Sequence, residues 1–286
     1  MFVVVSASTE LISVGPLLRG WRERRHLSQL QLASEAGTST RHLSYLETGR
    51  ARPSRAMVLR LAGTLQVPVR HRNTLLLSAG HSPEYPEHDL NDPAMHAVRA
   101  ALELILTRHE PHPAVVLDAG WNLLRANSAF RRLTIDVDPR LLEPPVNIAR
   151  LVLHPDALAP SIVNLADWQN HVTDRLRRQV ALTGNLGLTA LLAEIQTYLP
   201  VQENGTVKEP LLGGSPQLTM PLHLRLSTGE FKLFSTIAAF GTPLDATVSE
   251  LAIEMFFAAD DTTAAALREP AIEDSLAVKR AFEAAP

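Results

Sequence analysis

Residues 28–49 read SQLQLASEAGTSTRHLSYLETG, and this stretch decides the fold of the first part of the chain. Ser28 and Ser39 each stand where a side-chain oxygen can cap the start of a helix. Ala33 is small enough for two helices to cross closely. Gly37 follows it by four residues and suits the left-handed backbone of a turn. The pattern predicts two short helices joined by a tight turn.

Apolar residues at helical spacing predict three more helices around this pair. They are expected at Pro16–Arg25, Ser54–Leu65 and Arg72–Ala79. We therefore expect an all-α, five-helix domain over residues 15–80, preceded by an N-terminal extension over residues 1–14. The extension has a short apolar run without basic residues before it, so it is not interpreted as a secretory signal.

The charge of the chain is divided between two regions. Residues 15–80 contain eleven arginines, no lysine and three acidic residues, which gives a net charge of +8. Residues 81–286 contain 16 basic and 26 acidic residues, which gives −10. A basic domain neutralises phosphates and releases their counterions, whereas an acidic domain is repelled by DNA. The distribution therefore predicts double-stranded DNA as a partner of the first domain.

The stretch from Leu27–Gln29 through Leu46–Ser54 resembles the signature of the phage-repressor-like (Xre) helix-turn-helix family. The resemblance covers residues 15–80 and implies a homodimer whose second motif helix lies in the major groove. It implies that Thr40, Arg41, Ser44 and Tyr45 read bases, and that Gln29, Ser39, Arg50 and Arg52 contact phosphates. The glutamines that often read bases in this family are replaced here, so the operator sequence does not carry over.

The periodicity changes after a turn-rich junction at Gly80–Pro86. A connecting segment with a helix is expected over residues 81–110, opened by Asn91-Asp92-Pro93. Beyond it we expect an α+β domain over residues 111–286, with an antiparallel sheet and helices to one side. Its strands are expected at residues 114–117, 121–126, 218–226, 231–240 and 251–257.

This order of elements resembles a PAS-type sensor domain, in which the second strand runs into a helix. Together with the first domain, it makes the chain similar to the MmyB-like regulators, through His112–Asp118, Trp121–Asn127, Asn147–Leu151 and Ser249–Leu251. The resemblance implies a PAS-like domain that encloses a small apolar ligand, such as a fatty acid acting as effector, and no cofactor.

A ligand of this kind needs an apolar cavity with one or two polar anchors. The polar candidates are Asn127, Asn147 and Arg150, and the apolar candidates are Trp121, Phe130, Leu133, Leu151 and Trp168. Plainer interpretations stay open. Trp121 and Phe130 also suit an ordinary core, Asn127 also suits a helix cap, and Arg150 also suits a pair with an internal acid.

Other classes of site find little support in the sequence. His109, His112 and His154 lack the helical spacing of zinc hydrolases, because prolines interrupt it, so no metal site is expected. No nucleophile elbow, phosphate-cradling loop or dinucleotide-binding glycine pattern occurs, so we expect no catalytic residues and no enzyme. The chain has no cysteine and no apolar run of membrane-spanning length. These features favour a cytoplasmic protein that does not enter a membrane.

The sequence thus predicts a sequence-specific DNA-binding transcription regulator, dimeric on an inverted repeat, whose DNA binding is modulated by the ligand. Two alternatives stay open. One is a lipid-ester hydrolase fused to a DNA-binding module, although no activated nucleophile is displayed. The other is a regulator whose second domain is a ligand-free protein-interaction module. Two stretches match no strong motif, Pro155–Asp167 and the Gly-rich Val201–Ser215, of which the second is expected to be a loop. The tail Arg268–Pro286 is expected to be partly helical or frayed.

Overall fold

A computed structural model describes residues 13–198 and 220–269, and the chain divides into two units. The first unit comprises the chain through Glu87 together with Pro243–Ser249, and the second comprises the remaining residues. Most of the predicted N-terminal extension, the 201–215 stretch and most of the C-terminal tail lie outside the described residues.

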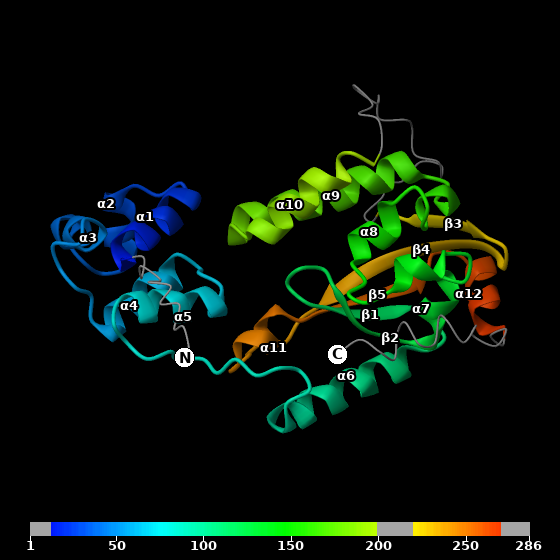
Figure 1. Cartoon of the computed structure of the whole chain (residues 1–286), viewed down its shortest axis with the longest axis horizontal. Helices are drawn as coiled ribbons and strands as arrows, with labels where there is room; N and C mark the ends of the chain where they lie inside the picture. The colour runs from blue at the N-terminus through cyan, green and yellow to red at the C-terminus, as the bar shows by residue number, and fades with distance from the viewer. Residues whose placement is uncertain (1–12, 199–219, 270–286) are drawn as a thin grey trace, which may run out of the picture. The chain divides into compact units, whose positions relative to one another are not determined.

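The first unit contains the five predicted α-helices, which confirms its all-α fold (Figure 1). They are α1 (Val14–Arg24), α2 (Gln29–Glu35), α3 (Thr40–Glu47), α4 (Arg55–Thr64) and α5 (Val69–Ser78). Their apolar stripes meet in one core, in which leucines such as Leu18, Leu43 and Leu61 are fully buried. Each such leucine stabilises the fold by about 1.5–3 kcal/mol.

Local chemistry explains where α2 and α3 begin and end. The Ser28 hydroxyl accepts from the Gln31 N–H, while the Gln31 side chain accepts from the Ser28 N–H, which completes a capping box. Ser39 caps α3 by accepting from the His42 N–H. Gly37 adopts φ +62° in the turn, as predicted. Gly15 is required for a different reason, because a Cβ there would lie 2.6 Å from two carbonyl oxygens of α3.

A short segment from later in the chain also belongs to the first unit. Helix α11 (Ala246–Glu250) lies between the fourth and fifth strands in sequence, yet the Ala246 N–H donates to the Pro86 carbonyl at 2.8 Å. Nearby, the buried Asn73 of α5 binds the backbone of Glu84 and Tyr85. The junction after α5 therefore belongs to the helical unit as far as Glu87.

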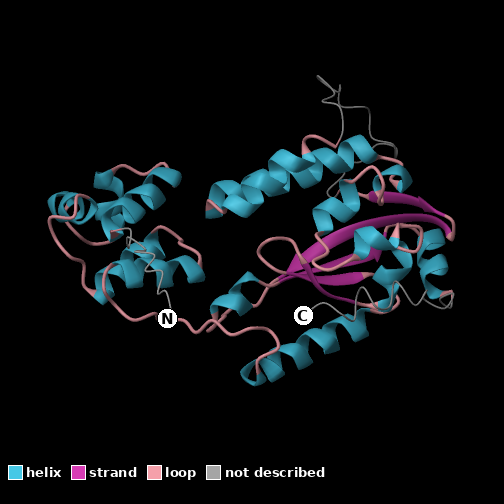
Figure 2. Cartoon of the chain, in the orientation of Figure 1, coloured by secondary structure: helices cyan, strands magenta, loops and turns pink. Residues whose placement is uncertain are grey.

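The second unit is built on a five-stranded antiparallel sheet in the order β2-β1-β5-β4-β3 (Figure 2). This confirms the α+β class and is consistent with the predicted PAS-like fold. Trp121 is not part of β2, because the Asp118 carboxylate accepts from the Gly120 and Asn122 N–H groups and holds a turn there. The strands are β1 (Ala114–Leu117), β2 (Leu123–Ala126), β3 (Leu222–Leu226), β4 (Gly229–Ala238) and β5 (Ala252–Ala258).

Helices cover both faces of this sheet, so the prediction of helices to one side was wrong. On one face, Phe256 belongs to the main core, and Glu254 pairs with Arg175 of α9. On the other face, the Phe257 ring meets His109 at the end of α6 (His96–His109). Figure 1 shows α6 and α9 on opposite sides of the sheet. The remaining elements are η1 (Pro93–Met95), α6 (His96–His109), α7 (Ser128–Leu133), η2 (Pro139–Leu142), α8 (Ile148–Leu153), η3 (Ala159–Ser161), α9 (Leu165–Thr183), α10 (Leu186–Ile195) and α12 (Asp261–Arg268).

Candidate DNA interface and ligand site

Helix α3 presents the predicted base-reading residues on its outer side. Leu43 and Leu46 anchor the inner side in the core. Arg41 is exposed, and Thr40, Ser44 and Tyr45 are half-exposed. The Arg41 Nε donates to the Tyr45 hydroxyl at 3.1 Å, and the guanidinium carbon lies 5.5 Å from the Tyr45 ring centroid. These contacts orient Arg41, and neither of its terminal nitrogens makes a hydrogen bond with the described residues.

A buried ionic cluster fixes α3 against the two preceding helices. The Glu47 carboxylate accepts from Arg22 at 2.6 and 2.9 Å and from the Gln29 amide nitrogen at 2.9 Å. Arg22 also donates to the Leu27 carbonyl at 2.8 Å. Gln29 therefore has a structural contact in addition to its predicted phosphate contact. This cluster was not predicted from the sequence. Its signal there was Glu47, an acidic residue at helical spacing from Leu43 in a basic segment.

The arginines of the first unit differ in what they contact. Arg19, Arg55 and Arg70 pair with Glu23, Glu84 and Glu87, respectively. By contrast, Arg50 and Arg52 are exposed after the end of α3, and neither has an ion pair among the described residues. The predicted phosphate contacts Ser39, Arg50 and Arg52 thus lie at the two ends of α3. Arg50 and Arg52, which follow this helix, therefore carry positive charge that no acidic side chain among the described residues neutralises.

Two of the three polar ligand candidates are engaged in holding the second unit together. The Asn127 Oδ1 accepts from the Ala114 and Phe130 N–H groups at 2.9 and 3.0 Å, and its Nδ2 donates to the His112 carbonyl. Asn147 caps α8, and its Nδ2 donates to the Gly120 carbonyl at 2.8 Å. Each asparagine is 6% exposed. The plainer interpretation of Asn127 as a helix cap accounts for its contact with Phe130, and its contacts with Ala114 and His112 tie α7 to the start of β1.

Arg150 lies at the surface in a bidentate pair. Its Nε and Nη2 both reach the Glu194 carboxylate at 2.7 Å, and the Tyr198 hydroxyl donates to the same carboxylate. The hydrogen bonds from Arg150 lower the pKa of Glu194 to about 2. Burial, together with the bond to Glu194, raises the pKa of Tyr198 to about 12. Arg150 thus has the internal acidic partner that the alternative interpretation requires.

The five apolar candidates meet in the main core of the second unit. Trp121, Phe130, Leu133, Leu151 and Trp168 are all buried there. The Trp121 indole N–H donates to Gln179 at 2.6 Å, and Arg175 stacks 4.5 Å from its ring centroid. The buried Trp168 N–H finds no acceptor among the described residues. A buried donor without a partner costs about 1–3 kcal/mol, so Trp168 is the candidate whose polar atom the described residues leave unengaged.

Comparison with known families identifies both units. Residues 13–75 match a model described as a helix-turn-helix domain. Residues 98–269, more than half of the chain, match the MmyB-like transcription regulator ligand binding domain. The chain belongs to the MmyB-like transcription regulators. In this MmyB-like regulator the helix-turn-helix domain lies in the first unit, and the ligand-binding domain, apart from Pro243–Ser249, lies in the second.

Similar proteins carry descriptions of the same kind. Three uncharacterized HTH-type transcriptional regulators, one from Mycobacterium bovis and two from strains of Mycobacterium tuberculosis, are 34% identical to this regulator over 98 residues. The match covers 34% of this chain and 38% of each relative. A solved RNA-binding light-oxygen-voltage receptor is 15% identical and aligns over 89% of this chain and 59% of its own, with a TM-score of 0.24, too low to indicate a shared fold.

Two further features concern residues 13–198 and 220–269 of the MmyB-like regulator. No group of three or more histidine or acidic side chains is arranged to hold a metal ion there. None of the helices in these ranges has the length and apolar character needed to cross a membrane.

Proposed function

We propose that this MmyB-like regulator binds double-stranded DNA through α3, as a homodimer on an inverted repeat. We further propose that a small apolar ligand, such as a fatty acid, modulates this binding from the second unit. The arrangement of α3 carries the proposal, because the helix is capped, presents Arg41 outward and has Arg50 and Arg52 beyond its end. Exposed arginines without an acidic partner are suited to bind phosphates and base edges.

Each side chain of the interface has a distinct proposed role. Arg41 pairs with the O6 and N7 acceptors of a guanine, and Thr40 contacts a thymine methyl. Ser44 and Tyr45 complete the base-reading side of the helix. Gln29, Ser39, Arg50 and Arg52 contact phosphates and set the register on the duplex. One such helix reads only a half-site, so two protomers are needed for a full operator.

In vitro selection with the full chain tests this assignment. From a random duplex library, we expect an inverted repeat whose half-site centres are about 10 base pairs apart, or a multiple of that spacing. Arg41→Ala should then relax the preference at one position of each half-site by about 1–3 kcal/mol, whereas Arg50→Ala should weaken all duplexes alike. Arg60→Ala is a matched control, because it removes an exposed arginine from α4. Unchanged base preference in Arg41→Ala would contradict the assignment.

The family match and the buried Trp168 N–H support a ligand within the core of the second unit. Native mass spectrometry of the purified chain tests for it. We expect a retained mass in the fatty-acid range and a rise in melting temperature with added fatty acid. Trp168→Phe, which keeps the ring and removes the donor, should weaken the stabilisation. A chain without added mass and without fatty-acid stabilisation would favour an interaction module instead.

We also infer that the regulator acts in the cytoplasm and catalyses no reaction, because the two family models that it matches describe a helix-turn-helix domain and the ligand-binding domain of a transcription regulator. The alternative of a lipid-ester hydrolase makes a different prediction in the same experiment. A hydrolase would convert an added fatty-acid ester to the free acid, which mass spectrometry detects directly, whereas the proposed regulator leaves the ester intact.

A further inference from the structure

The chain passes between the two units at three points, which follow Glu87, Thr242 and Ser249. The first point lies in the connecting segment that leads from the helical unit into α6. The other two flank the stretch Pro243–Ser249, which contains most of α11. In sequence this stretch lies between β4 and β5, two interior strands of the sheet, yet it belongs to the helical unit. The sheet of the second unit is therefore joined covalently to a segment of the first unit from both strands.

Helix α11 is held firmly within the helical unit. A helix of five residues is too short to be stable in water by itself, so it depends on the contacts around it. Ala246 is fully buried, and its N–H donates to the Pro86 carbonyl at 2.8 Å. The Asp245 carboxylate accepts from the Thr247 and Val248 N–H groups at 2.8 and 3.2 Å. These contacts make α11 a structured part of the helical unit.

Further contacts lead from Pro86 to the DNA-reading helix. The two residues before it are bound by Asn73 of α5, whose Oδ1 accepts from the Glu84 and Tyr85 N–H groups at 3.0 and 3.1 Å. Helix α5 meets α1 through an edge-on contact of two aromatic rings. Helix α1 in turn packs closely against the backbone of α3. A continuous series of contacts thus joins α11 to α3.

On the side of the second unit, β4 and β5 lie against the core proposed to hold the ligand. Phe231 and Leu233 of β4 and Phe256 of β5 belong to the same buried cluster as Trp168, the proposed ligand contact. Protein cores are closely packed, so an added molecule there requires its neighbours to move. A ligand in this core therefore changes the packing beneath both strands that lead to α11.

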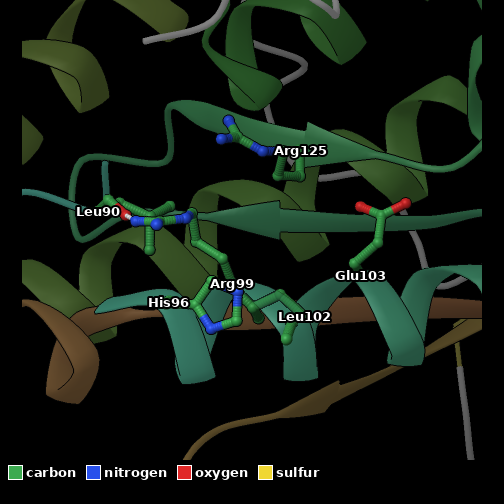
Figure 3. A pocket seen from close by; sticks show the side chains of 7 residues that line it. Leu90, His96, Arg99, Leu102, Glu103 and Arg125 are labelled. Atoms are coloured by element: carbon green, nitrogen blue, oxygen red, sulfur yellow. Dashed lines mark hydrogen bonds between the residues drawn. The ribbon is translucent and has the colours of Figure 1, made fainter. Parts of the chain in front are cut away.

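The connecting segment provides a less direct route. Arg99 of α6 donates to the Leu90 and Asp92 carbonyls at 2.6 and 2.7 Å, so the end of this segment is fastened to α6 (Figure 3). Among the described residues, the buried Leu102 and Leu106 of α6 are not part of the cluster that contains the proposed ligand contact. A change in that core thus meets β4 and β5 before it meets α6.

We propose that α11 transmits the ligand signal: a ligand in the core shifts β4 and β5, and α11 carries the shift through α5 to α3. The inference rests on the proposed ligand-responsive function and specifies its route. By linkage, the ligand alters DNA affinity to the extent that its own affinity differs between the two arrangements of this route. Loosening α11 should uncouple the two sites while each still binds its own partner.

Fluorescence anisotropy of the full chain on its selected operator, with and without saturating hexadecanoate, tests the route. The ratio of the two DNA affinities should be at least about fivefold in the wild type. Ala246→Pro removes the N–H that binds the Pro86 carbonyl and should bring the ratio to about one. A Gly-Ser-Gly insertion between Gly241 and Thr242, both exposed, should lower the ratio by at least about twofold.

The same insertion between Glu87 and His88 is the matched control, because it loosens the connecting segment and leaves α11 in place. It should keep the wild-type ratio. Native mass spectrometry establishes that each variant retains hexadecanoate, and the DNA affinity without hexadecanoate establishes that each helical unit is folded. If Ala246→Pro fails to fold, the insertion at Gly241 decides, since it lies in an exposed stretch.

Two outcomes would overturn the proposal, and they differ in what they mean for the proposed function. If the α11 variants keep the wild-type ratio, or if the insertion after Glu87 abolishes it, the signal does not pass through α11 and the ligand-responsive function stands. If the wild type binds hexadecanoate without any change in DNA affinity, the ligand-responsive function itself fails, and the route fails with it.

Discussion

The two units of this regulator use their polar side chains in opposite ways. In the helical unit, a buried cluster of Arg22, Gln29 and Glu47 fixes the helices, and Arg41, Arg50 and Arg52 remain exposed around α3. In the sheet unit, the polar residues that the sequence suggested as ligand contacts form helix caps and an ion pair instead. The fixed spacing of the helix-turn-helix motif therefore predicted which side chains of α3 are exposed, whereas the conspicuous polar residues of the second unit belong to its scaffold.

The largest expected effect follows from breaking the buried cluster of the helical unit. Glu47→Ala removes both short carboxylate hydrogen bonds of the Arg22 guanidinium, which is 9% exposed, and leaves it with the exposed Glu23 carboxylate at 3.8 Å as a counter-charge. Removing one partner of a buried pair costs about 3–5 kcal/mol in the free energy of unfolding. Urea denaturation of the full chain, followed at the helical signal, measures the loss.

Glu23→Ala is the matched control, since it removes an exposed acid that pairs with Arg19 at 2.7 Å and lies 3.8 Å from Arg22. It should cost less than about 1 kcal/mol. Similar losses for the two variants would show that the buried cluster does not fix α3. That result would contradict the contrast drawn between the two units.

The second effect concerns the scaffold role of Asn127. Asn127→Ala removes the cap of α7 and leaves the Ala114 N–H and the His112 carbonyl without their partner. We expect a loss of about 2–3 kcal/mol in the free energy of unfolding. Asn170→Ala, at an exposed position of α9, should have almost no effect. A variant of normal stability that no longer responds to fatty acid would make Asn127 a ligand anchor instead.

The smallest effect concerns the surface pair of Arg150 and Glu194. Arg150→Gln should lower the free energy of unfolding by less than about 1 kcal/mol at pH 7, because the pair is screened by solvent. The pKa of Glu194 is about 2 in the folded chain, below its usual 4.5. The stability from this shift is therefore present above pH 4.5 and is lost as the pH falls toward 2.

Denaturation of wild type and Arg150→Gln at pH 7, 4 and 2.5 tests this dependence. The difference between the two chains should shrink over the series, and fatty-acid binding at pH 7 should be the same in both. A loss of ligand binding in Arg150→Gln would restore Arg150 as an anchor and remove the contrast between the units.

The sequence predicted the helical unit well because its signals are local. Ser28, Gly37 and Ser39 act within a few residues of themselves, so their spacing determines the helix boundaries. The Arg22–Glu47 pair joins residues 25 positions apart and depends on how the helices pack, which no local pattern records. In the sequence, the nearest indication of this pair was Glu47, the acidic residue that follows the apolar stripe of α3.

In the sheet unit, the strands were predicted but their surroundings were not. All four residues of β1 are buried, and such an uninterrupted apolar run indicates a strand covered on both faces. That signal argued against helices on one side only. The partners of Asn147 and Arg150 lie on loops and helices 27 and 44 residues away, so their engagement emerges only in the fold.

The central claim is that a ligand in one unit alters DNA binding by the other. Fluorescence anisotropy of the full chain on its selected operator, with and without saturating hexadecanoate, measures this coupling directly. Linkage between the two sites predicts a change in DNA affinity of at least about fivefold, in either direction. An identical affinity with and without the fatty acid, in a chain shown to bind it, would contradict the account.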